Sequence, residues 1–341
     1  MDLQSVHQFS RIYIEEDLIE DPRARELIER VASLGSEARV IPIGRYGEVF
    51  NRPRQNFGMQ KHNPALILAR ERERFLYRGN ERINSWKQNE LYYNALVRNC
   101  VYNCDYCFLQ GMHQSAHTVM FLNNDDFIDA ARRQLEKGPM YLSISYLSEI
   151  LAFEPLYPYS AEWLEFARGR RDFALEIRTK SDYYQAISSL KPSENSFLVW
   201  SLSPEDISRE HERGCPPFRS RLFAASRAAD DGWPLKLTFD PVLALDGWRE
   251  RYRRAIEETF RRIPADRVKE VSFGVFRMNP DHLKRIRSFR LDAPYLHREY
   301  HRDNNAKLES YSPGKIDEIR RFMQDELSRQ LPDERISFVH G

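Results

Sequence analysis

From about residue 91 onward, short apolar runs alternate with longer segments of helical periodicity. Six apolar runs read as strands, at residues 91–97, 140–145, 173–180, 196–203, 235–242 and 270–278. Amphipathic segments between them, at residues 125–138, 160–169, 218–232 and 248–263, read as helices. Strands that alternate with helices form a parallel sheet with the helices outside. We therefore predict an α/β fold built on a partial (β/α)6 barrel. A doubly wound sheet is the alternative, but no G-x-G-x-x-G follows any of these strands.

The two ends of the chain are predicted to flank this barrel. Residues 11–16, 38–43 and 65–72 have strand character, residues 21–35 have helical character, and residues 46–64 read as irregular. We predict an N-terminal α/β cap over residues 1–90, the barrel over 91–280, and a C-terminal extension over 281–341. The extension consists of a basic and aromatic segment, a helix and a final strand.

Two of the predicted strands carry polar side chains at alternate positions: Glu176, Arg178 and Lys180 in one, and Lys236, Thr238 and Asp240 in the other. Alternate residues of a strand share one face, whereas parallel strands of α/β proteins are usually apolar throughout. We expect these faces to line a polar barrel interior, with the site at the carboxyl ends of the strands. An edge strand with one wet face is the alternative.

Charge and cysteine content narrow the class of protein. The 52 basic and 51 acidic residues give a net charge of +1, which predicts no global attraction to nucleic acid, so such binding requires a local patch. No apolar run is long enough to span a membrane, and the N-terminus lacks the pattern of a signal peptide. Four cysteines are far from a disulfide framework. We expect a cytoplasmic protein, monomeric by default, with no membrane partner.

Three of those cysteines, Cys100, Cys104 and Cys107, lie within eight residues at the spacing C-x3-C-x2-C. Three thiolates can hold zinc or iron, but they leave a tetrahedral metal or a four-iron cluster one ligand short. Such an open position suits a catalytic site. His113 is the one nearby histidine that could complete a structural zinc site, at an unusual spacing.

The cysteine motif, placed at the end of the first barrel strand, resembles that of the radical S-adenosylmethionine (radical SAM) enzymes. The resemblance implies that the three cysteines bind a [4Fe-4S] cluster whose unique iron chelates S-adenosylmethionine (SAM), and that an external flavodoxin- or ferredoxin-type protein supplies the electron. It implies a 5′-deoxyadenosyl radical that abstracts hydrogen from a substrate. Tyr106 stands where the family places an aromatic residue against the adenine.

Within that superfamily the chain resembles the spore photoproduct lyases. The segments CDYCFLQG, ALEIRTKS, LVWSLSPE, the EHERG turn, DDGWPLKLTFDPV and YSPGKIDEIRRF have counterparts there in the same order. The resemblance implies that SAM is contacted by Ser148, Glu149, Lys180 and Ser201. Hydroxyls and a carboxylate suit a ribose or an ammonium group, and a lysine suits a carboxylate.

The chain departs from that family at two positions. Tyr146 stands where the lyases carry the cysteine that returns a hydrogen atom to the substrate, and Phe108 stands where they carry a tyrosine of the hydrogen relay. Tyr146 could donate a phenolic hydrogen or pack and hydrogen-bond beside the substrate. Cys215, the remaining thiol, could reach the site if its loop folds inward, or it is an incidental loop residue.

The substrate stays open at the level of sequence. Residues 281–315 interleave basic and aromatic side chains, which suits contact with phosphates, but a solvated helix face explains the same composition. We weigh three hypotheses: a lyase-like enzyme acting on damaged DNA with another hydrogen donor, a radical enzyme acting on a small molecule, and a non-catalytic metal-binding module.

Overall fold

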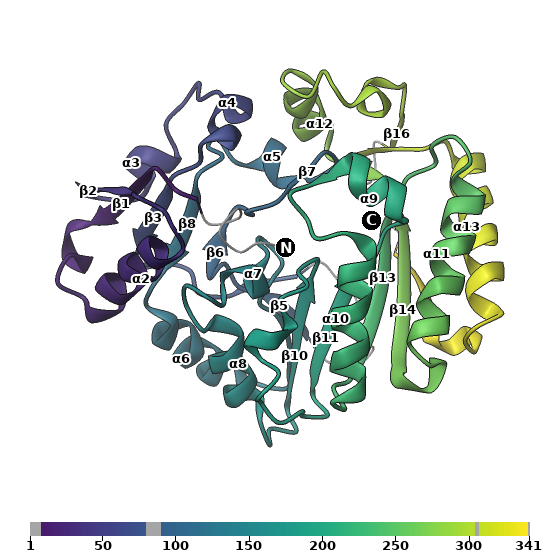
Figure 1. Ribbon diagram of the computed structural model, residues 1–341, viewed down its shortest axis with the longest axis horizontal. Coiled ribbons are helices and arrows are strands. Elements are labelled where there is room, and N and C mark those ends of the chain that lie inside the picture. Colours follow the sequence, from purple (N-terminus) through teal and green to yellow (C-terminus); the bar gives the residue numbers. More distant parts are fainter. Residues whose placement is uncertain (1–7, 80–89, 304–306, 340–341) are drawn as a thin grey trace.

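The computed structural model describes residues 8–79, 90–303 and 307–339. Its largest sheet has the strand order β18-β14-β13-β11-β10-β9-β5-β4. The six barrel strands are β5 (Glu90–Tyr93), β9 (Met140–Ser143), β10 (Phe173–Thr179), β11 (Ser196–Ser201), β13 (Leu235–Val242) and β14 (Val268–Val275). Neighbouring strands of this set are all parallel. The predicted partial (β/α)6 barrel is confirmed, and the sheet curls as an open half-barrel in Figure 1.

Both edges of this sheet carry an added strand. The C-terminal β18 (Ile336–Val339) pairs in parallel with β14, so the predicted final strand extends the barrel. At the other edge, β4 (Tyr77–Arg78) pairs antiparallel with β5.

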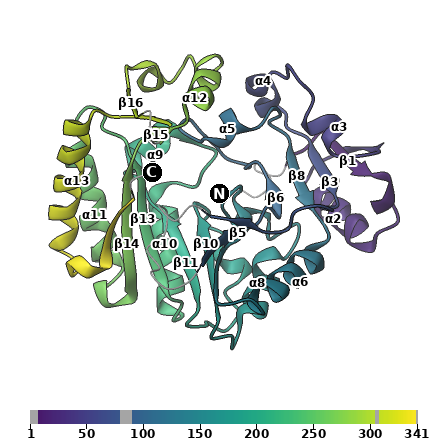
Figure 2. The same ribbon diagram turned by 180° about the vertical axis from the view of Figure 1, so that it is seen from behind.

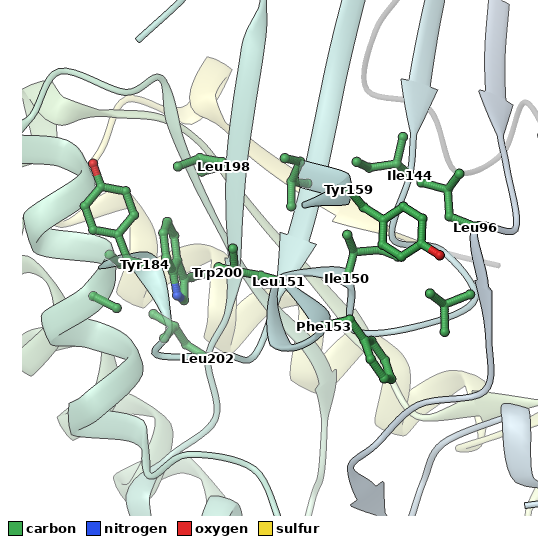
Figure 3. Close-up of a cluster of buried hydrophobic side chains, with 14 of the residues drawn as sticks. Leu96, Ile144, Ile150, Leu151, Phe153, Tyr159, Tyr184, Leu198, Trp200 and Leu202 are labelled. Carbon is green, nitrogen blue, oxygen red and sulfur yellow. The ribbon is translucent and has the colours of Figure 1, made fainter. Parts of the chain in front are cut away.

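Helices cover the outer face of the barrel, as the sequence predicts. They are α6 (Asn124–Leu135), α7 (Ile150–Phe153), α8 (Tyr159–Ala167), α10 (Phe218–Asp230), α11 (Trp248–Arg262) and α13 (Pro313–Ser328). Figures 1 and 2 show α10, α11 and α13 along the outside of β11, β13 and β14. Figure 3 shows outward-facing side chains of β11, among them Leu198 and Trp200, near Leu151 of α7. These apolar contacts bury the helices against the sheet.

The inner face of the barrel is polar, as predicted from the alternation in β10 and β13. Glu176, Lys236 and Thr238 are buried. Glu176 accepts a hydrogen bond from the Tyr141 hydroxyl, and Lys236 Nζ lies 3.0 Å from an oxygen of Glu270. Both strands lie inside the sheet, β10 between β9 and β11 and β13 between β11 and β14. The edge-strand alternative is therefore wrong.

A second sheet at the N-terminal side has the order β2-β1-β3-β8-β6. It contains β1 (Arg11–Glu15), β2 (Arg39–Ile43), β3 (Leu66–Ala69), β8 (Thr118–Phe121) and β6 (Val97–Arg98), with α2 (Pro22–Ser33) packed beside it. The prediction of one strand over residues 91–97 is therefore wrong. The chain leaves the barrel after Tyr93 and joins the second sheet at Val97. This second sheet combines strands from before residue 90 with β6 and β8 from after it, so it spans the predicted boundary between the cap and the barrel.

The segment 46–64 is more regular than predicted, since it contains α3 (Gly47–Phe50) and α4 (Phe57–His62). Asn56 caps α4 by accepting a hydrogen bond from the Met59 amide. The predicted strand 270–278 is divided, because β14 ends at Val275 and β15 (Arg277–Met278) pairs antiparallel with β17 (Leu308–Ser310) in a separate small sheet. The C-terminal extension contains α12 (Pro280–Arg287), which begins one residue before its predicted boundary, and then β16 (His301–Asp303) and β17. Among the described helices, none combines the length and the apolar character needed to cross a membrane.

Candidate metal and cofactor site

The three clustered cysteines lie on one loop between the two sheets. Cys100 follows β6, Cys104 ends β7 (Asn103–Cys104), and Cys107 precedes α5 (Leu109–Met112). The loop is held by an antiparallel ladder to β12 (Glu212–Arg213), in which Glu212 stands opposite Cys104. This ladder attaches the cysteine loop to a turn more than 100 residues further along the chain.

The thiols share one largely buried environment. Cys104 packs with Tyr102 and Ala152, and Cys100, Cys107 and Cys215 pack against that group. Cys215 Sγ lies 3.4 Å from Cys104 Sγ. The loop that carries Cys215 therefore does fold inward, and its thiol meets a cysteine of the motif.

A cationic side chain from the N-terminal region stands beside the thiols. Lys61 of α4 donates a hydrogen bond from Nζ to the carbonyl oxygen of Cys100, at 2.5 Å. Burial raises the pKa of Cys100, and it raises the pKa of Cys107 to about 11, while the positive charge of Lys61 opposes both shifts. Metal ligation requires thiolates, so a neighbouring ammonium group favours it.

The described side chains near the cysteine loop are not arranged around a single metal ion. Over the described ranges, no three His, Cys, Asp or Glu side chains surround a point that could hold one metal ion. In a four-iron cluster each cysteine binds a different iron, so the thiols need not converge on one point. His113 packs 5.2 Å from the ring of Phe50, and burial lowers its pKa to about 4. The zinc alternative finds no support in this geometry.

Glu149 and Lys180 lie together where β10 ends. Glu149 is buried, and its two carboxylate oxygens accept hydrogen bonds from Thr179 Oγ1 at 2.5 Å and from the Lys180 amide at 2.7 Å. Burial raises the pKa of Glu149 to about 7, although these hydrogen bonds lower it. The Ser148 hydroxyl donates a hydrogen bond of 2.6 Å to the carbonyl oxygen of Asn99, the residue directly before Cys100.

Tyr106 and Lys180 meet at the buried carboxylate of Glu212. The Tyr106 hydroxyl donates to Glu212 Oε1, and Lys180 Nζ lies 4.0 Å from the same oxygen and 5.7 Å from the Tyr106 ring. Ser203 Oγ also donates to Glu212 Oε1, at 2.9 Å. Arg221 forms an ion pair with Glu212 in which both side chains are 0% exposed.

Electrostatics around Glu212 keep it ionised. Burial alone would raise its pKa, but the charges of Arg221 and Lys180 lower it to about 2. Arg221 also donates to the carbonyl oxygen of Ser201, at 3.2 Å, which anchors the end of β11. Ser201, Lys180 and Tyr106, all expected to contact SAM, are therefore joined through one buried ion pair.

Tyr146 and Phe108 lie close to each other at the mouth of the barrel. Tyr146 is 39% exposed, and its ring centroid is 4.7 Å from that of Tyr93 and 6.1 Å from that of Phe108. Burial raises the pKa of Tyr146, with the nearby guanidinium groups of Arg277 and Arg178 opposing the shift. The two positions where the chain departs from the lyases therefore share one aromatic contact region.

Several side chains of the predicted basic and aromatic segment make internal contacts, whereas others, among them Lys284, Arg298 and Arg302, are exposed. Arg290 is buried and donates from Nε to Gln110 Oε1, at 3.0 Å, and from NH2 to the carbonyl oxygen of Asn103, at 3.3 Å. Tyr295 is buried as well, and the Tyr311 hydroxyl accepts a hydrogen bond from the Ala244 amide, at 2.9 Å. The Arg290 contacts brace the cysteine loop. Residues 304–306, where the segment becomes amide-rich, lie outside the described residues.

The C-terminal extension also touches the loop through a close helix crossing. A Cβ atom at Gly111 of α5 would lie 2.5 Å from the Cα atom and 2.7 Å from the carbonyl oxygen of His282 in α12. Only glycine permits this approach. Arg285 of α12 reinforces it by donating to the Gly111 carbonyl oxygen at 3.3 Å.

Four residues that build this site were not among the predicted site residues: Lys61, Glu212, Arg221 and Arg290. Each lies far in sequence from the cysteines, so spacing does not point to them. Glu212 belongs to the EHERG turn, and the family resemblance of that turn was a clue to this residue.

Comparison with known proteins gives one consistent result. The family model for spore photoproduct lyase matches residues 7–340. The spore photoproduct lyase of Bacillus subtilis (strain 168) is 24% identical over 267 residues, which cover 77% of this chain and 76% of the relative. The protein of the same name from Geobacillus sp. (strain Y412MC61) is 23% identical over 267 residues, with the same coverage of both chains.

Solved structures agree on the fold. A spore photoproduct lyase complexed with dinucleoside spore photoproduct superposes with a TM-score of 0.80 at 18% identity, over 97% of this chain and 98% of the other. A doubly substituted spore photoproduct lyase with bound AdoMet and dinucleoside spore photoproduct gives the same TM-score, identity and coverage. The family match removes the non-catalytic alternative. The chain belongs to the spore photoproduct lyase family, and it is a radical SAM enzyme that uses a [4Fe-4S] cluster and SAM.

Proposed function

We propose that this enzyme acts on a thymine photoproduct of DNA and that it completes the reaction without the donor cysteine of its relatives. The observation that carries the proposal is the family match over residues 7–340, which includes the cysteine loop, the barrel and the C-terminal extension together. A relative with a solved structure binds dinucleoside spore photoproduct. An external flavodoxin- or ferredoxin-type protein supplies the electron in this proposal.

Cys100, Cys104 and Cys107 hold the cluster in this proposal. When bound, the cluster and SAM together supply the 5′-deoxyadenosyl radical that removes hydrogen from the substrate. The protein contributes a buried loop, positioned by the β7–β12 ladder, and the positive charge of Lys61 beside the thiolates. Burial keeps water away from the thiolates and strengthens their electrostatic contacts.

Glu149, Lys180 and Tyr106 orient SAM. Each Glu149 oxygen already accepts one hydrogen bond and retains a second lone pair, which suits the methionyl ammonium group. Lys180 provides a positive charge for the methionyl carboxylate, and the Tyr106 ring provides a flat face for the adenine. Ser148 and Ser201 lie at the loop and strand ends that border this group, within reach of ribose hydroxyls.

The substrate occupies the mouth of the barrel beside Tyr146 and Phe108. Phe108 has no exchangeable hydrogen, so no relay passes through it. Tyr146 packs beside the substrate or hydrogen-bonds to it, because its ring is 39% exposed next to Tyr93. Asp240 and Arg277, which are linked by two hydrogen bonds of 2.8 Å and 3.0 Å, form the polar wall nearby.

The test is anaerobic turnover of dinucleoside spore photoproduct by the reconstituted enzyme with SAM and a reductant. The expected products are thymine dinucleoside and 5′-deoxyadenosine, or regenerated SAM in place of the latter. A Cys104→Ala variant should form neither product, because it lacks a cluster ligand. Cleavage of SAM without any change in the photoproduct would refute the proposal that the photoproduct is the substrate, but it would still support the proposed radical chemistry.

A second candidate substrate is a small molecule, and one observation favours it. Arg290 and Tyr295 of the extension are buried against the cysteine loop and the turn that holds it, which leaves fewer basic and aromatic groups for a DNA duplex. This candidate predicts SAM cleavage without measurable binding to oligonucleotides. Tight binding that weakens as salt increases would exclude it, because phosphate contacts release counterions.

A further inference from the structure

We propose that Cys104 and Cys215 are a redox modification site, which forms a reversible disulfide in the cluster-free protein and thereby blocks cluster assembly. The pairing is inferred from the positions of the two sulfur atoms. Its consequence for the cluster rests on the proposed role of Cys104 as a cluster ligand.

The fold brings these two thiols together from distant parts of the chain. The β7–β12 ladder places Glu212 opposite Cys104, and the turn that follows returns through a hydrogen bond of 3.0 Å from the Cys215 amide to the Glu212 carbonyl oxygen. The two sulfur atoms are then 3.4 Å apart. A disulfide bond is about 2.05 Å long, so the two sulfur atoms would have to approach each other by roughly 1.3 Å to form one. Both cysteines are free in this structure.

The surroundings assign different roles to the two thiols. Cys104 is buried, whereas Cys215 is partly exposed and follows an exposed Gly214. Within this pair, Cys215 is therefore the thiol more accessible to a low-molecular-weight disulfide such as oxidised glutathione. Gly214 has φ +77°, and no atom lies within 4 Å of the position that a Cβ atom would take there. The turn beside the Cys215 thiol is therefore open.

The reaction is ordinary thiol–disulfide exchange. Burial raises the pKa of Cys215, so only a small fraction of this thiol is ionised at neutral pH. That thiolate attacks one sulfur of the oxidised glutathione, which forms a mixed disulfide and releases one glutathione thiolate. The Cys104 thiolate then attacks the Cys215 sulfur, which forms the protein disulfide and releases the second glutathione. The two protons lost by the cysteines are taken up by the two glutathione thiolates. Two protein thiols are oxidised and one glutathione disulfide is reduced, so atoms and electrons balance.

The disulfide would compete with the cluster for one sulfur. A cluster ligand must be a thiolate, and a disulfide sulfur cannot serve. In the loaded protein, iron holds Cys104 and the exchange has no resolving thiol. The disulfide would therefore hold the cluster-free protein in an oxidised form, which accepts a cluster only after the disulfide is reduced.

The experiment begins with the full-length, cluster-free protein, reduced and then incubated anaerobically with oxidised glutathione. We expect the number of titratable thiols to fall from four to two, and peptide mapping should join the peptide of Cys104 to that of Cys215. Reconstitution with iron and sulfide should then load the oxidised protein several-fold less than the reduced protein, and dithiothreitol should restore loading. A Cys215→Ser variant should load iron equally well with and without prior oxidation, provided that bound glutathione is first excluded by mass spectrometry.

The outcomes are distinguishable from those of the proposed function. Thiol mapping needs no cluster, so failure of the reduced protein to bind iron would refute the cluster ligands and leave the disulfide test valid. A disulfide between two cysteines of the C-x3-C-x2-C motif, or stable mixed disulfides without a Cys104–Cys215 link, would overturn the inference. So would loss of iron loading on oxidation in the Cys215→Ser variant to the same extent as in the wild type.

Discussion

Replacement of Glu212 by glutamine removes the negative half of the ion pair that joins the cysteine loop to the barrel. The Arg221 side chain is 0% exposed and would keep its charge without a buried counter-charge. Breaking one side of a buried ion pair costs about 3–5 kcal/mol. Arg221 would keep its hydrogen bonds to the carbonyl oxygens of Pro216 at 2.7 Å and Ser201 at 3.2 Å and to Ser208 Oγ at 2.8 Å. These contacts place the expected loss toward the lower end of that range.

The pKa of Glu212 leads to a similar magnitude. Burial would raise this pKa, but Arg221 and Lys180 lower it from 4.5 to about 2. A fall of that size corresponds to about 3 kcal/mol of stabilisation. Because the pKa of the folded state lies below that of the unfolded state, the contribution is complete above about pH 4.5 and is lost as the pH falls toward about 2.

The assay is urea unfolding of wild type and Glu212→Gln at neutral pH and again near pH 3. We expect the variant to lose about 3 kcal/mol at neutral pH and the difference to shrink in acid. Glu318→Gln is the matched control, because Glu318 pairs with Arg249 and Lys315 at the surface, where such pairs contribute about 0–1 kcal/mol. A neutral-pH loss no larger than that of Glu318→Gln would refute the reasoning.

Three further predictions concern the same region. Gly111→Ala should cost about 1–3 kcal/mol in urea unfolding and reduce iron loading, since its Cβ would lie 2.5 Å from the Cα of His282. Gly314→Ala in α13, with no atom within 4 Å of its Cβ, should load iron normally and lose no stability, because alanine favours a helix more than glycine does. SAM affinity, measured by equilibrium dialysis on the reconstituted enzyme, should rise with pH through about 7 as Glu149 ionises, and Glu149→Gln should bind SAM weakly at all pH values. Tyr146→Phe should retain turnover of the photoproduct and Tyr146→Ala should lose most of it, whereas loss of product with normal 5′-deoxyadenosine formation in Tyr146→Phe would identify the phenol as the hydrogen donor.

The barrel could be predicted from the sequence because its signals are local. Strands and helices of the barrel alternate with clear changes in periodicity. The polar faces of β10 and β13 follow from polar residues at alternate positions, such as Glu176 and Arg178 in β10 and Lys236 in β13. The exit of the chain from the barrel after Tyr93 was not predictable in this way. Residues 91–97 are apolar enough for one strand, and only the pairing of β6 with β8 divides them.

The cysteine motif could likewise be predicted, since its spacing is a property of eight consecutive residues. The side chains that surround the motif in the fold could not be predicted from the sequence. Lys61, Glu212 and Arg290 come from α4, from the turn before Cys215 and from the C-terminal extension. No periodicity links such distant segments, so only the folded chain shows that they converge.

This convergence changes the interpretation of the C-terminal extension. By composition, its basic and aromatic side chains suit phosphate contacts, but a buried guanidinium group must donate its hydrogen bonds to acceptors inside the protein. Arg290 donates to Gln110 and Asn103, which flank the segment from Cys104 to Cys107. Arg290 therefore positions the cysteine loop and is not free to contact a substrate. We expect any DNA-binding surface to lie among the basic side chains that remain exposed, such as Lys284 and Arg302. Charge reversal at those two positions should weaken oligonucleotide binding without loss of iron, whereas substitution of Arg290 should reduce iron loading itself.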